Sequence, residues 1–429
     1  MVNQLDSEYI RACYFTSWAR KRPSPADFYP ENYVPDLCTH VFYYGGTVDE
    51  KYIAEAMYPA DLFNGPNGGY FARIVKLKES QPGLNVILTF RYQDYNDVQR
   101  KKLLSNSGNR KRFIDSAVQL IDQYRFDGID IEWEFYAPEN KANFALFMKE
   151  LKAAIGDRIV TLRAAPLKSV IDDVYDVPSL ANSVDFVNVR AYGMYSNFNP
   201  GVQHHSPLHS RQNDSSDENA AFALNYWTEK GMPKGKLVMG IATYGRGWRL
   251  ADPENTALGA LKKDRPLQIY TQEWGIGAYY EICKLEGKEF WDDAMKVPYI
   301  VSGDLWYGYD DAESIKIKME WIKENKFGGA FVGTLDFDDF NGICGEGKYP
   351  LTNVIKQYLE GNDFPVQVRK EPLLTQRAAH GSIDVCTAVL TRFTALPGKN
   401  STKNHCLVFR PMVALRNVVF DDFFNISFS

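Results

Sequence analysis

The sequence predicts an α/β fold in which eight parallel strands close into a (β/α)8 barrel, with a small α+β insertion between strands seven and eight. Short apolar segments recur along most of the chain, and amphipathic stretches separate them. This alternation is typical of parallel strands covered by helices. An open doubly wound sheet is the competing fold, but no glycine-rich phosphate loop follows the first strand.

The predicted strands are nearly continuous apolar runs, as expected where both faces of a strand are buried. They span residues 11–16, 39–44, 85–90, 128–133, 159–165, 186–192, 237–242 and 329–335. Helices are predicted at 109–124 and 140–155, where apolar residues recur every three or four positions.

Two regions depart from the strand–helix rhythm. Residues 244–314 are rich in aromatic and turn-forming residues and are too long for a plain connection, so we expect the insertion domain there. The barrel then comprises residues 9–243 and 315–361. Residues 362–429 show neither periodicity nor low complexity, and the sequence assigns this tail no fold.

Composition excludes two classes of partner. The 49 Lys and Arg against 54 Asp and Glu give a net charge of −5, so the chain lacks the basic footprint of a nucleic-acid-binding protein. No apolar run approaches the ~18 residues of a membrane helix, so we expect no membrane partner. The aromatic content of 14% serves the core and would also suit a sugar-binding cleft.

The chain has six cysteines and no CxxC pair, which fits three disulfides, or two disulfides and a loose pair. Disulfides imply an oxidising compartment. The first fifteen residues lack the apolar segment of a signal peptide, so we expect a secreted protein whose start is missing from this sequence. The alternative is that the thiols are reduced.

The segment FDGIDIEWEF, residues 126–135, carries the strongest functional signal. Strand side chains alternate, so Asp130, Glu132 and Glu134 share one face, and the residues between them share the other. In a barrel the acids would point inward, toward the carboxyl-terminal mouth where active sites lie. Burial and mutual repulsion should raise at least one carboxyl pKa, as a proton donor requires.

Two other interpretations of this segment remain open. One is an acidic edge strand whose carboxylates are solvated. The other is a divalent metal site, but no histidine stands at ligand spacing beside the acids, and the loop histidines His204, His205 and His209 are more often solvated or hydrogen-bonded. We expect no metal and no cofactor.

FDGIDIEWE resembles the DGxDxDxE signature of glycoside hydrolase family 18, the chitinases and chitinase-like lectins. The resemblance extends over residues 11–360 through RACYFTSWARKRP, LCTHVFYYGG, HHSPLHSR, TYGR, AYYEIC and LDFDDFNGICGEGKYPL. It implies a Cys13–Cys38 and a Cys283–Cys344 disulfide, and it offers no counterpart for Cys386 and Cys406. It also implies chitin or N-acetylglucosamine oligomers as partners and a monomeric protein.

The resemblance implies a substrate-assisted retaining mechanism. Glu134 would protonate the scissile oxygen while the substrate's own acetamide carbonyl attacks the anomeric carbon. Glu132 would orient the acetamide, Asp130 is the inner carboxylate, and Tyr192 would hydrogen-bond the acetamide. The implied substrate-binding residues are Asp127, Tyr14, Trp18, Tyr244, Arg246 and Glu281.

Several positions depart from the family pattern. Glu132 is one methylene longer than the expected Asp, and RAYG at 190–193 replaces MxYD. Arg190 is expected to form an ion pair with Glu132 or Glu134. Phe90 and Arg91 replace two glycines and should fill space near the sugar, and Gly333 replaces a tryptophan platform.

These departures leave the function open. One interpretation is a chitinase with impaired activity, and the other is a chitinase-like lectin that binds oligosaccharide without efficient hydrolysis. A barrel used only as a protein–protein or structural module is a third. Restoring Asp at 132 and Trp at 333 together is expected to raise any rate.

Overall fold

The computed structural model describes residues 9–62, 68–91, 97–133, 138–195, 200–211 and 217–361. All of these residues lie in one compact unit, Met1–Thr375. Among them, no helix has both the length and the apolar character needed to cross a membrane.

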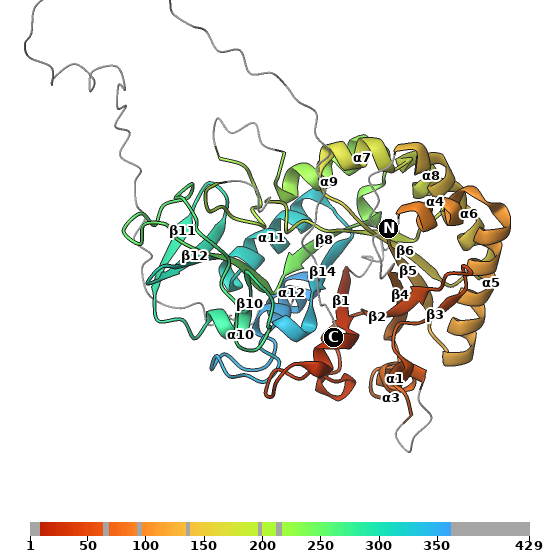
Figure 1. The fold of residues 1–429 in the computed structure, drawn as a ribbon, viewed down its shortest axis with the longest axis horizontal. Coiled ribbons are helices and arrows are strands. Elements are labelled where there is room, and N and C mark those ends of the chain that lie inside the picture. The colour runs from red at the N-terminus through yellow and green to blue at the C-terminus, as the bar shows by residue number, and fades with distance from the viewer. Residues whose placement is uncertain are drawn as a thin grey trace, which may run out of the picture. The chain divides into compact units, whose positions relative to one another are not determined.

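Eight parallel strands form the closed barrel that the sequence predicts (Figure 1). Around the barrel each strand pairs with the next, and pairing of β1 with both β14 and β2 closes the ring. The strands are β1 (Ile10–Thr16), β2 (His40–Val48), β4 (Asn85–Arg91), β5 (Gly128–Glu132), β6 (Ile159–Ala164), β7 (Phe186–Val189), β8 (Leu237–Ala242) and β14 (Gly329–Gly333). The predicted fold class is therefore confirmed.

The strand boundaries differ from the predicted ones mainly at the carboxyl ends. β2 runs on to Val48 because its last residues pair antiparallel with a short strand, β3 (Ala54–Ala56), which the sequence analysis missed. β7 ends at Val189 because the chain turns there, with the amide of Ala191 donating to the carbonyl of Val189 at 2.7 Å. Residues 190–192 therefore follow the strand and lie at the barrel mouth.

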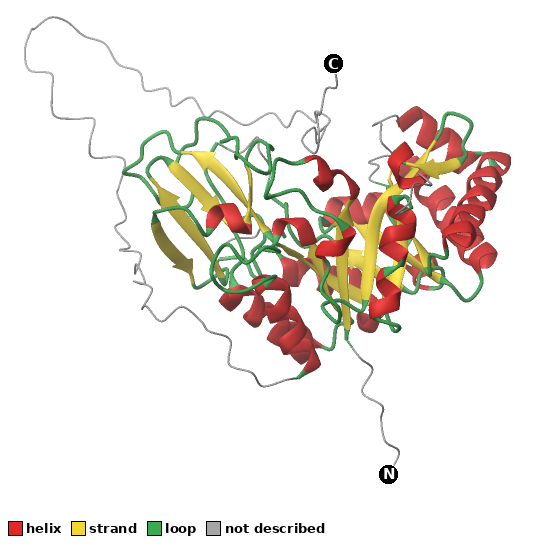
Figure 2. Ribbon diagram, turned by 90° about the horizontal axis from the view of Figure 1, so that it is seen from below, coloured by secondary structure: helices red, strands yellow, loops and turns green. Residues whose placement is uncertain are grey.

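Helices lie around the outside of the barrel strands (Figures 1 and 2). In the longest one, α5, the buried face carries Phe113, Ala117 and Ile121, and the Asn106 side chain caps the first turn by accepting from the Asn109 amide. The helices are α1 (Pro59–Leu62), α2 (Tyr70–Val75), α3 (Leu77–Ser80), α4 (Asp97–Ser105), α5 (Ser107–Tyr124), α6 (Lys141–Ile155), α7 (Lys168–Val174), α8 (Val177–Ala181), α9 (Ala220–Glu229), α10 (Tyr279–Ile282), α11 (Ala312–Asn325) and α12 (Pro350–Glu360).

Between β8 and β14 the chain forms a second, antiparallel sheet, which is the predicted insertion (Figure 2). Its order is β10-β9-β13-β12-β11. The strands are β9 (Tyr244–Arg249), β10 (Ile276–Ala278), β11 (Lys288–Asp292), β12 (Val297–Ser302) and β13 (Leu305–Gly308). Trp248 and Trp306 are fully buried in this sheet's own apolar cluster. Because β9 begins two residues after β8, the insertion starts beside the barrel mouth.

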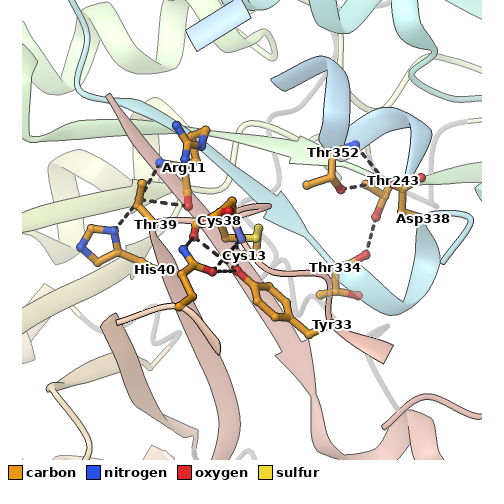
Figure 3. The surroundings of a disulfide bond; sticks show 12 residues. Arg11, Cys13, Tyr33, Cys38, Thr39, His40, Thr243, Thr334, Asp338 and Thr352 are labelled. Carbon is orange, nitrogen blue, oxygen red and sulfur yellow. Dashed lines mark hydrogen bonds between the residues drawn. A yellow bond between two sulfur atoms is a disulfide. The ribbon is translucent and has the colours of Figure 1, made fainter. Parts of the chain in front are cut away.

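The described residues contain two disulfides, with the pairings that the family resemblance implies. Cys13 of β1 is bonded to Cys38, and the Tyr33 hydroxyl accepts a hydrogen bond from the Cys38 amide at 3.2 Å beside it (Figure 3). Cys283 is bonded to Cys344 across 61 residues of sequence, which ties the insertion to the segment after β14. A loop of that length is worth about 4 kcal/mol in the chain-entropy account. Cys386 and Cys406 lie outside the described residues.

Candidate functional site

A fully buried carboxylate, Asp130, occupies the centre of the barrel. Its oxygens accept hydrogen bonds from the hydroxyl groups of Tyr14 (3.0 Å), Thr89 (3.1 Å) and Thr161 (2.6 Å), which come from β1, β4 and β6. Asn188 of β7 donates in turn to the Tyr14 hydroxyl at 3.0 Å. We call these five residues the inner layer. Neutral donors from three strands converge on one acid here, and a fourth strand supports one of those donors, so the inner layer links four strands of the barrel to β5.

Burial is the main influence on the Asp130 carboxyl and raises its pKa to about 6. The hydrogen bonds from Thr161, Tyr14 and Thr89, and the positive charge of Arg163, act in the opposite direction. The expectation that one of the strand acids has a raised pKa therefore holds for Asp130.

One layer closer to the carboxyl ends of the strands, arginines replace the neutral donors. Glu132 of β5 lies beside Arg91 of β4 in the strand register, and Arg163 of β6 forms an ion pair with it. Arg190 follows β7. We call Arg91, Glu132, Arg163 and Arg190 the mouth layer. Three cations and one carboxylate thus face the barrel mouth within the described part of this layer.

Arg163 dominates this layer. Its side chain is only 11% exposed, and one guanidinium nitrogen donates to Glu132 while the other donates to the Tyr192 hydroxyl at 3.0 Å. The guanidinium carbon lies 5.4 Å from the ring centre of Tyr14 and 6.0 Å from that of Tyr44. These distances permit cation–π attraction. Arg163 therefore fills the middle of the mouth and contacts both groups to which the family resemblance assigns the acetamide.

Glu132 forms its ion pair with Arg163, a partner that the sequence analysis did not predict. The other expected pair, Arg190 with Glu134, involves a residue outside the described ranges and stays a prediction. Alternation along β6 places Arg163 on the same inward face as Thr161, next to the acidic strand. The second oxygen of Glu132 has no hydrogen-bond partner among the described residues, although it is buried.

Gly333 lies directly beneath Tyr192. A Cβ atom at Gly333 would stand 2.1 Å from the Tyr192 hydroxyl oxygen and 2.7 Å from the ring carbon that bears it. Such contacts are impossible without movement of Tyr192. The space that a larger side chain would take is thus already filled by Tyr192, so placing Trp at 333 requires the Tyr192–Arg163 hydrogen bond to be given up.

Aromatic residues border the mouth. The ring of Trp18, in the short helical turn after β1, lies 5.5 Å from Tyr44 and 5.9 Å from the guanidinium of Arg91. Tyr244, at the start of β9, packs edge-on against Tyr192 with ring centres 6.0 Å apart. The structure thus brings six of the sequence-predicted site residues together. They are Tyr14, Trp18, Asp130, Glu132, Tyr192 and Tyr244.

Asp127 lies elsewhere, and its assignment to substrate binding is withdrawn. It precedes the first residue of β5, so it lies at the amino-terminal end of the barrel, opposite the mouth. There it accepts hydrogen bonds from Lys78 at 2.9 Å and from the Val86 amide at 2.8 Å. Its position in the sequence motif reflects a structural contact between neighbouring strands.

Glu281 also has a structural environment. Its carboxylate accepts hydrogen bonds from the backbone amides of Tyr270, Thr271 and Ala278 at 2.8 to 3.2 Å. These bonds secure the turn that precedes α10. This buried, amide-bonded carboxylate is poorly placed to meet a sugar.

The expectation that Phe90 fills space near the sugar was wrong. It faces the helix layer and packs against Phe113 with ring centres 5.3 Å apart, because its neighbour Thr89 points inward. Only Arg91 of that pair belongs to the mouth.

The predicted proton donor Glu134 lies outside the described residues. His204 and His205 are buried, and burial lowers the pKa of His204 to about 4. Within the described ranges, no group of three or more metal-ligating side chains is present.

The comparisons with known proteins agree with this architecture. The family model described as glycosyl hydrolases family 18 matches residues 10–338. The chain belongs to this family. It is 38% identical to a probable endochitinase of Caenorhabditis elegans over 379 residues, which is 84% of this chain and 61% of the nematode protein. The chain therefore spans less than two thirds of that relative.

Solved structures show the same fold. The immunomodulatory active chitinase TsES1 of Trichuris suis superposes with a TM-score of 0.78 at 36% identity, covering 82% of this chain and 100% of that one. Human YKL-39, described as a pseudo-chitinase with retained chitooligosaccharide binding properties, has a TM-score of 0.77 at 30% identity, with 82% and 100% covered. An active chitinase and a pseudo-chitinase are thus similar to this chain to about the same degree.

Sequence reasoning missed Arg163. A charged residue inside an otherwise apolar strand, two positions after Thr161, was the available signal. On the inward face of β6 it had to lie beside the acidic strand β5 once the barrel was assumed.

Proposed function

We propose that this protein is a chitinase-like lectin that binds β-1,4-linked N-acetylglucosamine oligomers at the barrel mouth and hydrolyses them poorly. The observation that carries the proposal is the position of Arg163, which is bonded to both Glu132 and Tyr192. In the family mechanism these two positions hold the substrate's acetamide. An arginine that already occupies their hydrogen-bonding groups competes with that acetamide.

The charge of Arg163 supports the same conclusion. Substrate assistance makes the acetamide carry a developing positive charge while the leaving oxygen departs. A fixed guanidinium in this partly desolvated mouth repels that charge, and the repulsion is strong where water screens it poorly. Catalysis depends on stabilising the charge that develops in the transition state, so Arg163 opposes the chemical step.

The aromatic border of the mouth favours retained binding. Sugars pack their apolar faces on aromatic rings, and the partly exposed Trp18 lies at the mouth, where its ring packs against the buried Tyr44. The relative YKL-39 is a pseudo-chitinase that keeps chitooligosaccharide binding. We further propose that the protein acts as a monomer outside the cell, consistent with its two disulfides.

Active hydrolysis is the second candidate. The sequence keeps Glu134 at the position of the family's proton donor, and TsES1 is an active chitinase of similar likeness. In that case Glu134 would protonate the leaving oxygen despite the altered mouth.

One experiment separates the two functions. The full chain is titrated with an N-acetylglucosamine tetramer by calorimetry and incubated with a fluorogenic oligomer, beside a Glu134→Gln variant. We expect binding with a cleavage rate equal to that of the variant. Cleavage that the variant abolishes would establish a hydrolase, and absence of binding would leave the barrel as a scaffold.

A further inference from the structure

A run of positively charged groups continues from the mouth layer onto the insertion sheet. Three of these positive charges influence the pKa of one buried group, the hydroxyl of Tyr244. Burial raises the pKa of Tyr244 to about 12, and Arg246, Arg190 and Arg163 each lower it, in that order. These arginines come from β9, the segment after β7, and β6. The geometry agrees: Arg246 lies two residues after Tyr244 on β9, and Arg163 donates to the hydroxyl of Tyr192, whose ring packs against Tyr244.

Lys262 extends this run. Its ammonium nitrogen lies 4.7 Å from the ring centre of Trp248 and 5.2 Å from that of Tyr195. The nitrogen is buried and has no hydrogen-bond acceptor among the described residues. Burial is the largest influence on Lys262, and together with the charges of Arg246 and Arg265 it lowers the lysine pKa to about 8. The two rings attract the ammonium group, but a buried cation beside other cations stays partly uncompensated until an anion joins it.

Among the described residues, the acids near the mouth are already engaged by other groups. Asp130 is engaged by three hydroxyl groups of the inner layer, and Glu132 is paired with Arg163. Arg22, on the β1 side of the mouth, has its own acidic partner, Asp336. Tyr244 brings a further unused group, because its buried hydroxyl has no hydrogen-bond partner among the described residues. Lys262 and Tyr244 thus offer donors that no acceptor among the described residues uses.

We propose that the oligosaccharide taken by this cleft carries an anionic group, a carboxylate or a sulfate ester, which binds Arg246 and Lys262. The inference rests on the proposed function, because it adds a charge requirement to the same sugar-binding site. Guanidinium and ammonium groups are the usual partners of carboxylate and sulfate oxygens. Arg163 and Arg190 contribute a field of the same sign, which favours entry of an anion over a neutral sugar.

The test compares three tetramers on the full chain by calorimetry. One is neutral N-acetylglucosamine tetramer, the second carries 6-O-sulfate groups, and the third alternates N-acetylglucosamine with a uronic acid. We expect at least one charged tetramer to bind at least tenfold more tightly than the neutral one in 50 mM salt. The difference should shrink in 500 mM salt, since salt screens charges. The tighter of the two charged ligands identifies the anion.

A matched pair of variants locates the contact. Lys262→Gln should weaken binding of the preferred charged tetramer about tenfold and change binding of the neutral one less than twofold. Lys263→Gln removes a neighbouring exposed lysine and should change neither. Thermal unfolding of both variants checks that each remains folded.

The failures are distinguishable. Equal binding of neutral and charged tetramers overturns the charge requirement and leaves the proposed function standing. Equal effects of the two lysine variants overturn the assignment to Lys262. Binding of no tetramer overturns the proposed function and this inference together.

Discussion

The inner layer and the mouth layer of the same barrel solve the problem of a buried carboxylate in opposite ways. Asp130 accepts hydrogen bonds from neutral hydroxyl groups, and burial raises its pKa, which favours the uncharged carboxyl form. Glu132, two residues later on the same strand, is matched by a full positive charge on Arg163. Neutral donors hold a carboxylate without occupying the cavity, whereas a guanidinium fills it. We therefore expect the inner layer to support the fold and the mouth layer to influence which ligand binds.

The largest expected effect comes from the inner layer. Asp130→Ala removes the acceptor of the Tyr14, Thr89 and Thr161 hydroxyl groups and should lower the free energy of unfolding by about 3 kcal/mol. The measurement is urea denaturation. Removing Glu132 and Arg163 together takes away both charges of the mouth pair and should cost about 1 kcal/mol or less. Equal losses in the two proteins would refute the division of roles between the layers.

The native protein and an Asp130→Asn variant should differ in how their stability depends on pH. The folded pKa of about 6 lies above the ordinary value of about 3.9, so the neutral carboxyl is favoured on folding. Its contribution is fully present below about pH 4 and is lost as the pH rises through 6. The unfolding free energy of the native protein relative to Asp130→Asn should therefore fall by about 2 kcal/mol between pH 4 and pH 7. A constant difference across that range would mean that Asp130 ionises normally.

The mouth layer should control turnover. Replacing Arg163 by Ala removes the guanidinium that competes with the acetamide, and replacing Glu132 by Asp shortens the carboxylate. The substrate's acetamide then has space to bind and a carboxylate of the family's usual length to orient it. We expect hydrolysis of a fluorogenic oligomer to rise at least tenfold, which is about 1.4 kcal/mol of barrier. Adding Glu134→Gln should abolish the gain. An unchanged rate in the double variant would mean that Arg163 does not limit the chemistry.

The smallest expected effect concerns the space that Tyr192 fills. Gly333→Ala places a Cβ atom against the Tyr192 hydroxyl and should break its hydrogen bond with Arg163, costing about 1 kcal/mol in unfolding free energy. Gly83→Ala is the control, because nothing lies within 4 Å of a Cβ atom there. Urea denaturation of both variants measures the difference. If the two alanines cost the same, Tyr192 moves freely and does not block the mouth.

The sequence by itself determined where the strands and helices of this protein lie along the chain, and which residues of a strand face the barrel interior. Apolar runs alternating with helical periodicity predicted the barrel, and alternation within 128–133 placed Asp130 and Glu132 on the inward face. These features follow from local geometry, because the spacing of apolar residues along a short segment shows whether it is a strand or a helix. The family resemblance added the cysteine pairings, which local geometry does not carry.

Only the tertiary structure decided which side chains meet. Glu132 and its partner Arg163 are 31 positions apart, and their contact depends on the pairing of β5 with β6. The same dependence moved Asp127 to the far end of the barrel and put Tyr192 over Gly333. Strand order and stagger are properties of the whole closed sheet, so contacts across the barrel appear only once all eight strands are in place.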